Sequence, residues 1–344
     1  MGPTGETRVV QIHPTRQCNL RCLHCYSSSS PAVREFLSPQ LLHAAISDIA
    51  DEGYEWVSFS GGEPTVYPAL AGTLSHAKAV GLKTILVSNG MLLNESRLDA
   101  LCPNVDLLVL SLDGTPESHN RLRNNPRAFE LMSNRLEGLR QRNVAFGFIF
   151  TLTQYNLDEL IWVVDFAQRQ QARLVQIHPL ENVGAASAHL AGSVPDAVEM
   201  AYAFAVKLQL QQRLGNALAL QLDLIHSDAL RQFPEHFYAG RGGVDRGAPL
   251  GAILTPLVIE TDGTVVPVQY GFARCYAMGN LHEASLKSLA REWKANGLDR
   301  FEDLCGETYR RATAGDRNGF LNWYELLGQV AAERSVLATD AACA

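Results

Sequence analysis

In the first half of the chain, short apolar runs alternate regularly with longer amphipathic segments. The runs that we predict as strands cover residues 9–13, 56–60, 84–88, 107–111, 146–151 and 173–178. The segments that we predict as helices cover residues 37–52, 68–80, 95–101, 128–142 and 157–169. Nearly continuous apolar strands that alternate with helices indicate a parallel sheet buried on both faces. The spacing fits a doubly wound sheet or a (β/α) barrel, and in both folds the chemistry lies at the carboxyl ends of the strands.

A cluster of cysteines follows the first predicted strand directly. Cys18, Cys22 and Cys25 have the spacing Cys-x3-Cys-x2-Cys. Three thiolates on one loop can hold three irons of a cubane iron–sulfur cluster and leave the fourth iron open to a ligand. His13 or His24 could instead complete a closed, four-ligand zinc site. The residues by themselves therefore leave both metals open.

Composition narrows the class of protein. The count of seven cysteines is odd, and a chain of 344 residues needs no disulfide framework, so the cluster favours metal chemistry in a reducing compartment. The formal net charge of −7 argues against a surface that coats nucleic acid. The N-terminus has no signal-peptide pattern, and no apolar run reaches membrane-spanning length. We expect a soluble, cytoplasmic protein that binds neither nucleic acid nor membrane.

The cysteine triad on the loop after the first strand resembles the signature of the radical S-adenosylmethionine superfamily. An aromatic residue usually follows the last cysteine in that family, and here it is Tyr26. The resemblance implies a partial (β/α)6 barrel with one [4Fe-4S] cluster on Cys18, Cys22 and Cys25. It also implies that the open iron chelates S-adenosylmethionine, which one electron cleaves to methionine and a 5′-deoxyadenosyl radical. A reducing flavodoxin or ferredoxin would supply the electron.

The turn after the second strand matches the GGEP motif of that family. It consists of Gly61, Gly62, Glu63 and Pro64. Glycines let the backbone approach a ligand closely, and Glu63 offers negative charge to an ammonium group. The resemblance therefore implies that this turn binds the cofactor.

Polar residues also end the next two strands, where the family has residues near the cofactor. Ser88 and Asn89 follow the third strand, and Ser111 and Asp113 follow the fourth. Each alone would be an ordinary helix-cap or turn residue. Together with Tyr26 and the GGEP turn, they are the cofactor-binding residues that the resemblance implies.

Two later segments resemble peptide-modifying members of the family. Residues 119–130 contain Arg121 and Arg123, which could meet a carboxylate or simply be solvated. Residues 178–187 begin with His178, which could face the substrate or serve as a hydrogen-bonded scaffold histidine.

The C-terminal part is predicted to contain a β-hairpin with an Asp-Gly turn at Asp262 and Gly263. With the later Gly279-Asn280 pair, it resembles SPASM and twitch extensions, whose cysteines hold an auxiliary cluster. The position after Pro267, typically cysteine there, is Val268. We therefore expect a partial barrel over residues 1–190 and a degenerate α+β cap over residues 191–344.

Few cysteines remain for a second cluster. Cys102 lies in the barrel half, and Cys275, Cys305 and Cys343 lie in the cap half with no CxxC pair. We therefore expect a single cluster. Cys275 could donate a hydrogen atom and Tyr276 could quench a radical, although a buried free thiol is the simpler interpretation of Cys275.

The sequence thus predicts an enzyme that cleaves S-adenosylmethionine reductively and abstracts a substrate hydrogen. The leading hypothesis is modification of a ribosomally made peptide by cross-linking, epimerisation or thioether formation. The alternative is radical dehydrogenation, epimerisation or decarboxylation of a sugar or nucleoside in natural-product biosynthesis. A non-enzymatic iron–sulfur or zinc-binding module is the second alternative. The sequence leaves the bond formed, the physiological reductant and the oligomeric state undetermined.

Overall fold

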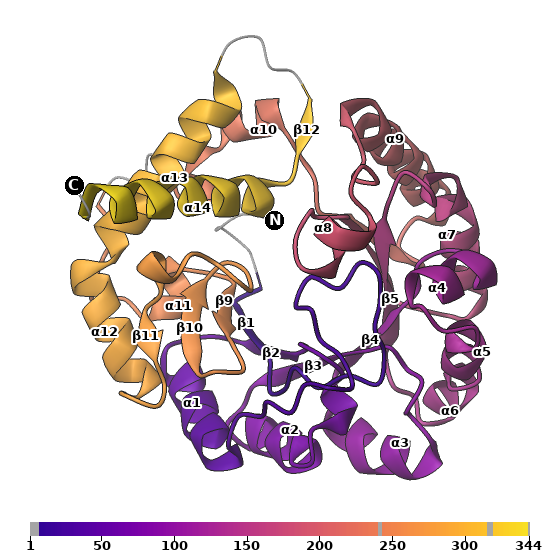
Figure 1. The fold of residues 1–344 in the computed structure, drawn as a ribbon. Coiled ribbons are helices and arrows are strands. Elements are labelled where there is room, and N and C mark those ends of the chain that lie inside the picture. Colours follow the sequence, from indigo (N-terminus) through magenta and orange to yellow (C-terminus); the bar gives the residue numbers. More distant parts are fainter. Residues whose placement is uncertain (1–6, 240–242, 315–318, 343–344) are drawn as a thin grey trace.

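The computed structural model describes residues 7–239, 243–314 and 319–342. Its main sheet has the strand order β11-β10-β9-β1-β2-β3-β4-β5-β6-β7. The strands of the parallel series are β1 Val9–Ile12, β2 Trp56–Phe59, β3 Lys83–Ser88, β4 Leu107–Ser111, β5 Phe146–Leu152, β6 Leu174–Pro179 and β7 Ala219–Leu222. Figure 1 shows these strands curving around a central opening, with helices outside them. The predicted α/β fold with a partial barrel is confirmed.

Helices connect successive strands, and all of them except α8 lie on the outside of the sheet (Figure 1). They are α1 Pro39–Asp51, α2 Leu70–Ala79, α3 Glu95–Leu101, α4 Pro116–Leu122, α5 Ala128–Ser133, α6 Leu136–Gln141, α7 Leu160–Arg169, α8 Ala185–His189 and α9 Ala197–Leu214. Short 3-10 turns lie at η1 Pro64–Val66, η2 Cys102–Asn104 and η3 Leu157–Glu159. Ser38 caps α1 as its residue type indicates, because its side chain accepts a bond from the backbone N–H of Leu41 at 3.1 Å.

The prediction of a single helix over residues 128–142 is wrong in one respect. The segment is divided into α5 and α6 around Asn134 and Arg135. There the backbone tightens, since the N–H of Arg135 bonds the carbonyl of Met132 at 3.0 Å. Ser133 and Asn134 are weak helix formers that favour such interruptions.

The predicted hairpin is present and continues the barrel sheet. It consists of β9 Leu257–Ile259 and β10 Thr264–Pro267, which pair antiparallel. Strand β9 also pairs parallel with β1, with Val10 opposite Leu257 and Ile12 opposite Ile259. The edge of β1 is therefore covered by chain from the C-terminal part.

The remaining elements surround the hairpin. They are β8 Ile225–His226, α10 Ser227–Gln232, η4 Pro234–Phe237, α11 Leu250–Ile253, η5 Arg274–Tyr276, β11 Gly279–Asn280, α12 Leu286–Asn296, α13 Leu298–Thr313, β12 Phe320–Leu321 and α14 Trp323–Ala342. The sequence pattern also predicts helices over residues 285–294 and 322–335, which correspond to α12 and α14, whereas α13 is missed. The buried residues of α13 recur mostly every three or four positions, which is typical of a helix, but many charged residues stand between them. They are Leu298, Phe301, Leu304, Cys305, Thr308 and Ala312.

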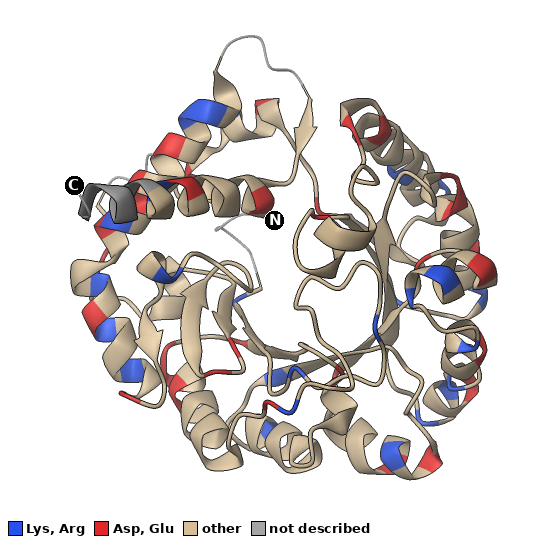
Figure 2. Ribbon diagram, in the orientation of Figure 1, with Lys and Arg blue, Asp and Glu red and all other residues tan. Residues whose placement is uncertain are grey.

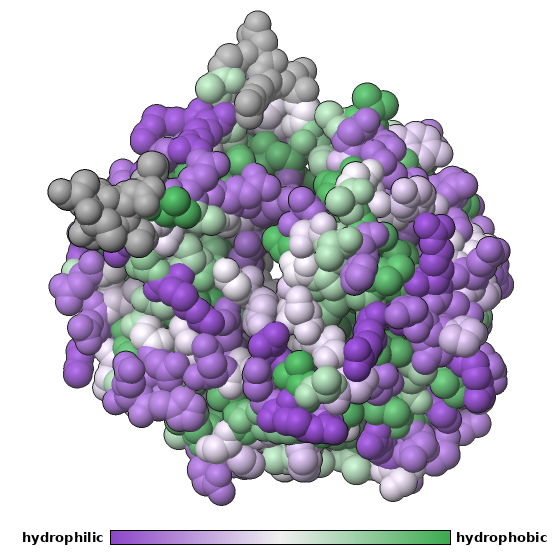
Figure 3. Space-filling model, in the orientation of Figure 1, coloured by the Kyte–Doolittle hydropathy of each residue, from purple (hydrophilic) through white to green (hydrophobic). Residues whose placement is uncertain are grey.

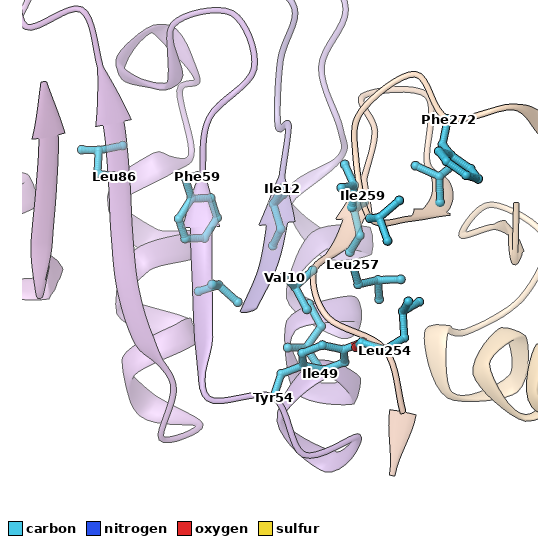
Figure 4. Close-up of a cluster of buried hydrophobic side chains, with 14 of the residues drawn as sticks. Val10, Ile12, Ile49, Tyr54, Phe59, Leu86, Leu254, Leu257, Ile259 and Phe272 are labelled. Atoms are coloured by element: carbon cyan, nitrogen blue, oxygen red, sulfur yellow. The ribbon is translucent and has the colours of Figure 1, made fainter. Parts of the chain in front are cut away.

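The core crosses the boundary between the two predicted parts. Val10, Ile12 and Phe59 from the barrel pack in one apolar cluster with Leu257 and Ile259 from the hairpin (Figure 4). All five are fully buried. Each contributes roughly 1.5–3 kcal/mol to folding, so the hairpin and the barrel stabilise each other. None of the helices in the described ranges has the length and apolarity needed to span a membrane.

Candidate functional site

The loop that carries the three cysteines lies between β1 and α1, at the carboxyl ends of the strands. In Figure 1 it is drawn inside the ring of strands. The loop folds back on itself, because the N–H of Cys18 bonds the carbonyl of Ser30 at 3.2 Å and the hydroxyl of Thr15 bonds the carbonyl of Glu35 at 2.7 Å. Figure 2 shows that most charged residues lie on the outer helices rather than on this loop. Figure 3 shows that this face of the molecule is hollowed at its centre.

Each of the three sulfur atoms accepts an N–H bond. Cys18 is buried, and Cys22 and Cys25 are partly exposed. The donors are the backbone N–H of Leu20 to Cys18 at 3.4 Å, the backbone N–H of Ser29 to Cys25 at 3.4 Å, and the guanidinium of Arg123 to Cys22 at 3.9 Å. N–H groups directed at sulfur stabilise the thiolate form, which is the form that binds metal.

Burial works against that ionisation when no metal is bound. It raises the pKa of Cys18 to about 12 and the pKa of Cys22 to about 11, although Arg123 opposes the shift at Cys22. A metal supplies the positive charge that deprotonates such thiols. Among the described residues, no three His, Cys, Asp or Glu side chains are arranged around a single ion. A cubane cluster binds each thiolate through a different iron, and three thiols spaced along one loop are a donor set of that kind.

The two histidines that could complete a zinc site have other partners. The Nε2 atom of His24 lies 3.9 Å from a carboxylate oxygen of Asp113. The ring of His13 stacks on Tyr270 with centroids 4.5 Å apart, and its Nε2 atom lies 3.4 Å from the hydroxyl of Tyr26. Burial lowers the pKa of His13 to about 3 and that of His24 to about 4, so both rings are neutral.

The two glycines of the GGEP turn let the cysteine loop approach β2. The N–H of Gly62 bonds the carbonyl of Thr15, and the N–H of Glu63 bonds the carbonyl of Gln17, both at 2.9 Å. A Cβ atom on Gly62 would lie 2.2 Å from the carbonyl oxygen of Gln17, and Gly61 has a φ of +103°. The close approach that the motif indicates is therefore made to the cysteine loop.

The carboxylate of Glu63 joins the ends of β2 and β3. It is 1% exposed and accepts bonds from the hydroxyl of Ser88 and the backbone N–H of Asn89, both at 2.8 Å. The amide of Asn89 in turn donates to the side-chain oxygen of Asn19 at 2.7 Å. The structure therefore brings together three residues that the sequence singled out, and Pro64 begins η1 beside them. Sequence reasoning missed Asn19, although it lies inside the cysteine motif.

Asp113, at the end of β4, is fully buried in a charged cluster. Its carboxylate accepts a bond from Arg123 Nε at 2.6 Å and from the backbone N–H of Thr151 at 3.2 Å. Burial alone would raise its pKa, but Arg123 and the nearby histidines His24 and His119 hold the pKa well below its usual range. Ser111 is also buried at the same strand end.

Tyr26 links the cysteine loop to the C-terminal part. The residue as a whole is 40% exposed, whereas its hydroxyl lies beside His13 and Ser60, where burial raises the pKa of the phenol. The ring of Tyr270, which follows the hairpin, meets Tyr26 edge-on with centroids 5.5 Å apart. A residue from the predicted cap therefore contacts a predicted cofactor-binding residue.

His178, at the end of β6, is held by two carboxylates. Its Nδ1 atom lies 3.0 Å from Asp223 Oδ2, and its Nε2 atom lies 3.5 Å from Glu181 Oε1. Burial would lower its pKa, but hydrogen bonds and charge from these partners raise it to about 10. The ring is therefore protonated at neutral pH. Asn322, just before α14, also donates to Glu181 at 2.9 Å.

The cap residues that could take part in radical chemistry are only partly accessible. Cys275 in η5 is partly buried, and Tyr276 is 4% exposed, with the guanidinium of Arg300 4.9 Å from its ring centroid. Cys305 is fully buried in α13, and Cys343 lies outside the described residues. Val268, which stands where a cysteine is typical, packs in the main apolar cluster. A single cluster remains a prediction.

Comparison with known proteins agrees with this geometry. Residues 12–167 match the family model described as the radical SAM superfamily. Fe-coproporphyrin III synthase of Methanosarcina barkeri is 28% identical over 52% of this chain and 45% of its own length. PqqA peptide cyclase of Ruegeria pomeroyi is 27% identical over 74% of this chain and 65% of its own length. The chain therefore spans about half to two thirds of the length of these relatives.

A solved structure shows the same fold over nearly the whole chain. Native anSMEcpe with bound AdoMet and Kp18Cys peptide has a TM-score of 0.62 and is 18% identical, with 96% of this chain and 99% of that chain covered. This likeness extends over both the barrel and the elements that surround the hairpin. The family match shows that residues 12–167 are similar to the radical SAM superfamily, and the solved structure shows the same fold over nearly the whole chain.

Proposed function

We propose that this chain holds one [4Fe-4S] cluster on Cys18, Cys22 and Cys25 and uses it to cleave S-adenosylmethionine. When bound, these two groups supply the electron and the carbon radical that remove a hydrogen atom from a substrate. The observation that carries the proposal is that three thiols on one strand-end loop each accept an N–H bond. The protein's part is to hold the loop and to shield the reacting groups from water.

Residues at three strand ends support this assignment. Glu63 and Asn89 connect the cysteine loop to β2 and β3, and Asp113 connects it to β4 through Arg123. We propose that the cofactor lies against this rigid floor, beside Tyr26 and Ser111. A preorganised floor of this kind orients a reactive group without reorganisation during the reaction.

We further propose that the substrate is a peptide. One relative is named as a peptide cyclase, and one structure of the same fold contains a bound peptide. The charged cluster of His178, Glu181 and Asp223 lies at the end of β6, where a substrate above the cysteine loop could reach it. Its hydrogen-bonding groups suit the polar backbone and side chains of a peptide.

Anaerobic reconstitution tests the chemistry. With iron, sulfide, dithionite and S-adenosylmethionine, the full chain should produce 5′-deoxyadenosine. The triple variant with Cys18→Ala, Cys22→Ala and Cys25→Ala should bind no iron and yield none. The matched control is Cys102→Ala, outside the loop, which should retain both iron and product. If the reconstituted wild type produces no 5′-deoxyadenosine with or without substrate, the proposal is wrong.

Deuterium transfer tests the substrate class. A digest of uniformly deuterated protein provides peptides, and deuterated nucleosides and hexoses provide the competing classes. We expect deuterium to enter 5′-deoxyadenosine from the peptide pool. Transfer from the sugars or nucleosides alone would contradict a peptide substrate and favour the alternative.

A further inference from the structure

We infer that Arg123 is a positioning residue that donates a charged hydrogen bond to Cys22 and raises the reduction potential of the cluster there. Asp113 holds the guanidinium in place for this purpose. The inference rests on the proposed function only in requiring that Cys22 binds a cluster. This role is distinct from cofactor binding. It also differs from the contact with a carboxylate that the sequence analysis considers for Arg123.

The geometry places one side chain between two partners. The Nε atom of Arg123 lies 2.6 Å from Asp113 Oδ2, and its Nη1 atom lies 3.9 Å from Cys22 Sγ. The Arg123 side chain is 11% exposed, and that of Asp113 is fully buried. A guanidinium is a planar fork with donors on several edges, so it can satisfy a carboxylate and a sulfur at once.

The backbone brings Arg123 to the loop independently of its charge. Arg123 directly follows α4, whose last residue is Leu122, and the carbonyl of Leu122 accepts a bond from the N–H of Leu23 at 2.9 Å. Leu23 follows Cys22 directly in the sequence. This contact places the end of α4 beside Cys22, whichever side chain residue 123 carries.

Asp113 is fixed by its own neighbours. Its second carboxylate oxygen accepts the N–H of Thr151 on β5 at 3.2 Å, and its backbone N–H donates to His119 Nδ1 at 3.1 Å. His24 and His119 lie within 3.9 Å of the carboxylate. The carboxylate therefore cannot swing toward the cluster, and the positive end of the pair faces the sulfur.

The three thiols differ in the charge of their donors. Cys18 and Cys25 accept neutral backbone N–H groups, from Leu20 and Ser29. Within the described ranges, Cys22 alone accepts a bond from a charged group. Hydrogen bonds to sulfur and local charge set the reduction potential of iron–sulfur clusters. Because reduction adds one electron, a fixed cation beside one sulfur stabilises the reduced cluster more than the oxidised one.

The test compares variants of the full chain after anaerobic reconstitution, without S-adenosylmethionine. The variants are Arg123→Gln, which removes the charge, and Arg123→Lys, which keeps it. The readouts are iron and sulfide per chain, the rate of iron loss to a chelator, and the midpoint potential from an EPR-monitored redox titration. The control is Arg121→Gln on the same helix, whose guanidinium lies 5.1 Å from the centroid of the Tyr155 ring.

We expect Arg123→Gln to shift the midpoint potential to a more negative value and to lose iron about 10-fold faster than wild type. Arg123→Lys should recover most of the potential, and Arg121→Gln should match wild type. Asp113→Asn should also shift the potential, because it releases the guanidinium. If Arg123→Gln does not fold, the Lys and Asn variants carry the comparison.

Several results would overturn the inference. One is an Arg123→Gln variant whose midpoint potential and rate of iron loss equal those of wild type. Another is a shift of the midpoint potential in Arg121→Gln as large as that in Arg123→Gln, which would mean that the bond to Cys22 has no specific effect. A third is a Lys variant whose potential equals that of the Gln variant. A cluster that forms but never cleaves S-adenosylmethionine would contradict the proposed function and leave this inference standing, whereas a wild type without a cluster would overturn both.

Discussion

Two carboxylates decide the protonation of His178, and this gives stability a specific pH dependence. The pKa of its imidazole is raised from 6.5 to about 10 in the folded chain. Between these values the folded state binds more protons than the unfolded state, so the free energy of unfolding falls as pH rises. The contribution of the protonated His178 ring to the free energy of unfolding is complete below pH 6.5 and is lost as pH rises through about 10.

We therefore predict that His178→Gln lowers the free energy of unfolding at pH 6 and that its difference from wild type narrows toward pH 10. Urea denaturation at a series of pH values measures this difference. Asp223→Asn should reproduce most of the effect, because it removes the nearer partner. A difference that stays constant over the whole pH range would show that His178 acts through packing rather than through its charge.

Single residues at the site were predicted with uneven success. Cys18, Cys22 and Cys25 are evident from spacing alone, and Glu63 is evident from its motif. Their partners are not, because Asn19 and Arg123 are ordinary polar residues in sequence. They become distinctive only through contacts such as Arg123 to Cys22, which spans 101 positions.

The turn after β2 packs closely against the backbone of the cysteine loop at Gly62. We predict that Gly62→Ala lowers the free energy of unfolding by about 1–3 kcal/mol and reduces the iron bound after reconstitution. The added Cβ would lie 2.2 Å from the carbonyl oxygen of Gln17, so the cysteine loop must shift. Chemical denaturation and iron analysis measure the two effects.

The control for this prediction lies in the next helix. Gly72 is inside α2, and a Cβ there would meet nothing within 4 Å. Gly72→Ala should therefore stabilise the chain by about 0.5–1 kcal/mol, because alanine favours the helix. Equal effects of the two substitutions would show that contact with the loop does not matter at Gly62.

Elements with strong local signals were predicted well, and those with mixed signals were not. Helix α1 has a capping serine and a clear apolar face, and it begins next to Ser38 as expected. Helix α13 was missed because its apolar residues stand among many charges. The interruption between α5 and α6 was missed because weak helix formers lower helix stability without necessarily ending a helix.

A buried ion pair connects α1 in the barrel with α12 in the C-terminal part. Lys294 on α12 lies 3.4 Å from Glu52 at the end of α1, and both side chains are nearly buried. Lys294 also donates to the carbonyl of Ala248, and Glu52 accepts the N–H of Leu250. The pair therefore joins the barrel to the segment that leads into the hairpin.

We predict that Lys294→Met lowers the free energy of unfolding by about 3–5 kcal/mol, because it leaves the Glu52 charge buried without its partner. Adding Glu52→Gln to this variant should restore part of the loss. The control is Lys287→Met, since Lys287 and Asp51 join the same two helices at 3.3 Å but are each 61% exposed. That change should cost less than about 1 kcal/mol. Similar losses at both sites, measured by urea denaturation, would contradict the prediction.

For the whole molecule, the succession of strands β1 to β6 along the chain and the position of the cysteine loop at a strand end could be read from the sequence. Periodicity and residue spacing are local properties, and parallel strands must end at one edge. Only the tertiary structure decided that β9 pairs with β1, that Glu63 joins two strand ends and that Arg123 reaches Cys22. These contacts depend on how buried charges and backbone groups find partners far away in the chain, which no local pattern encodes.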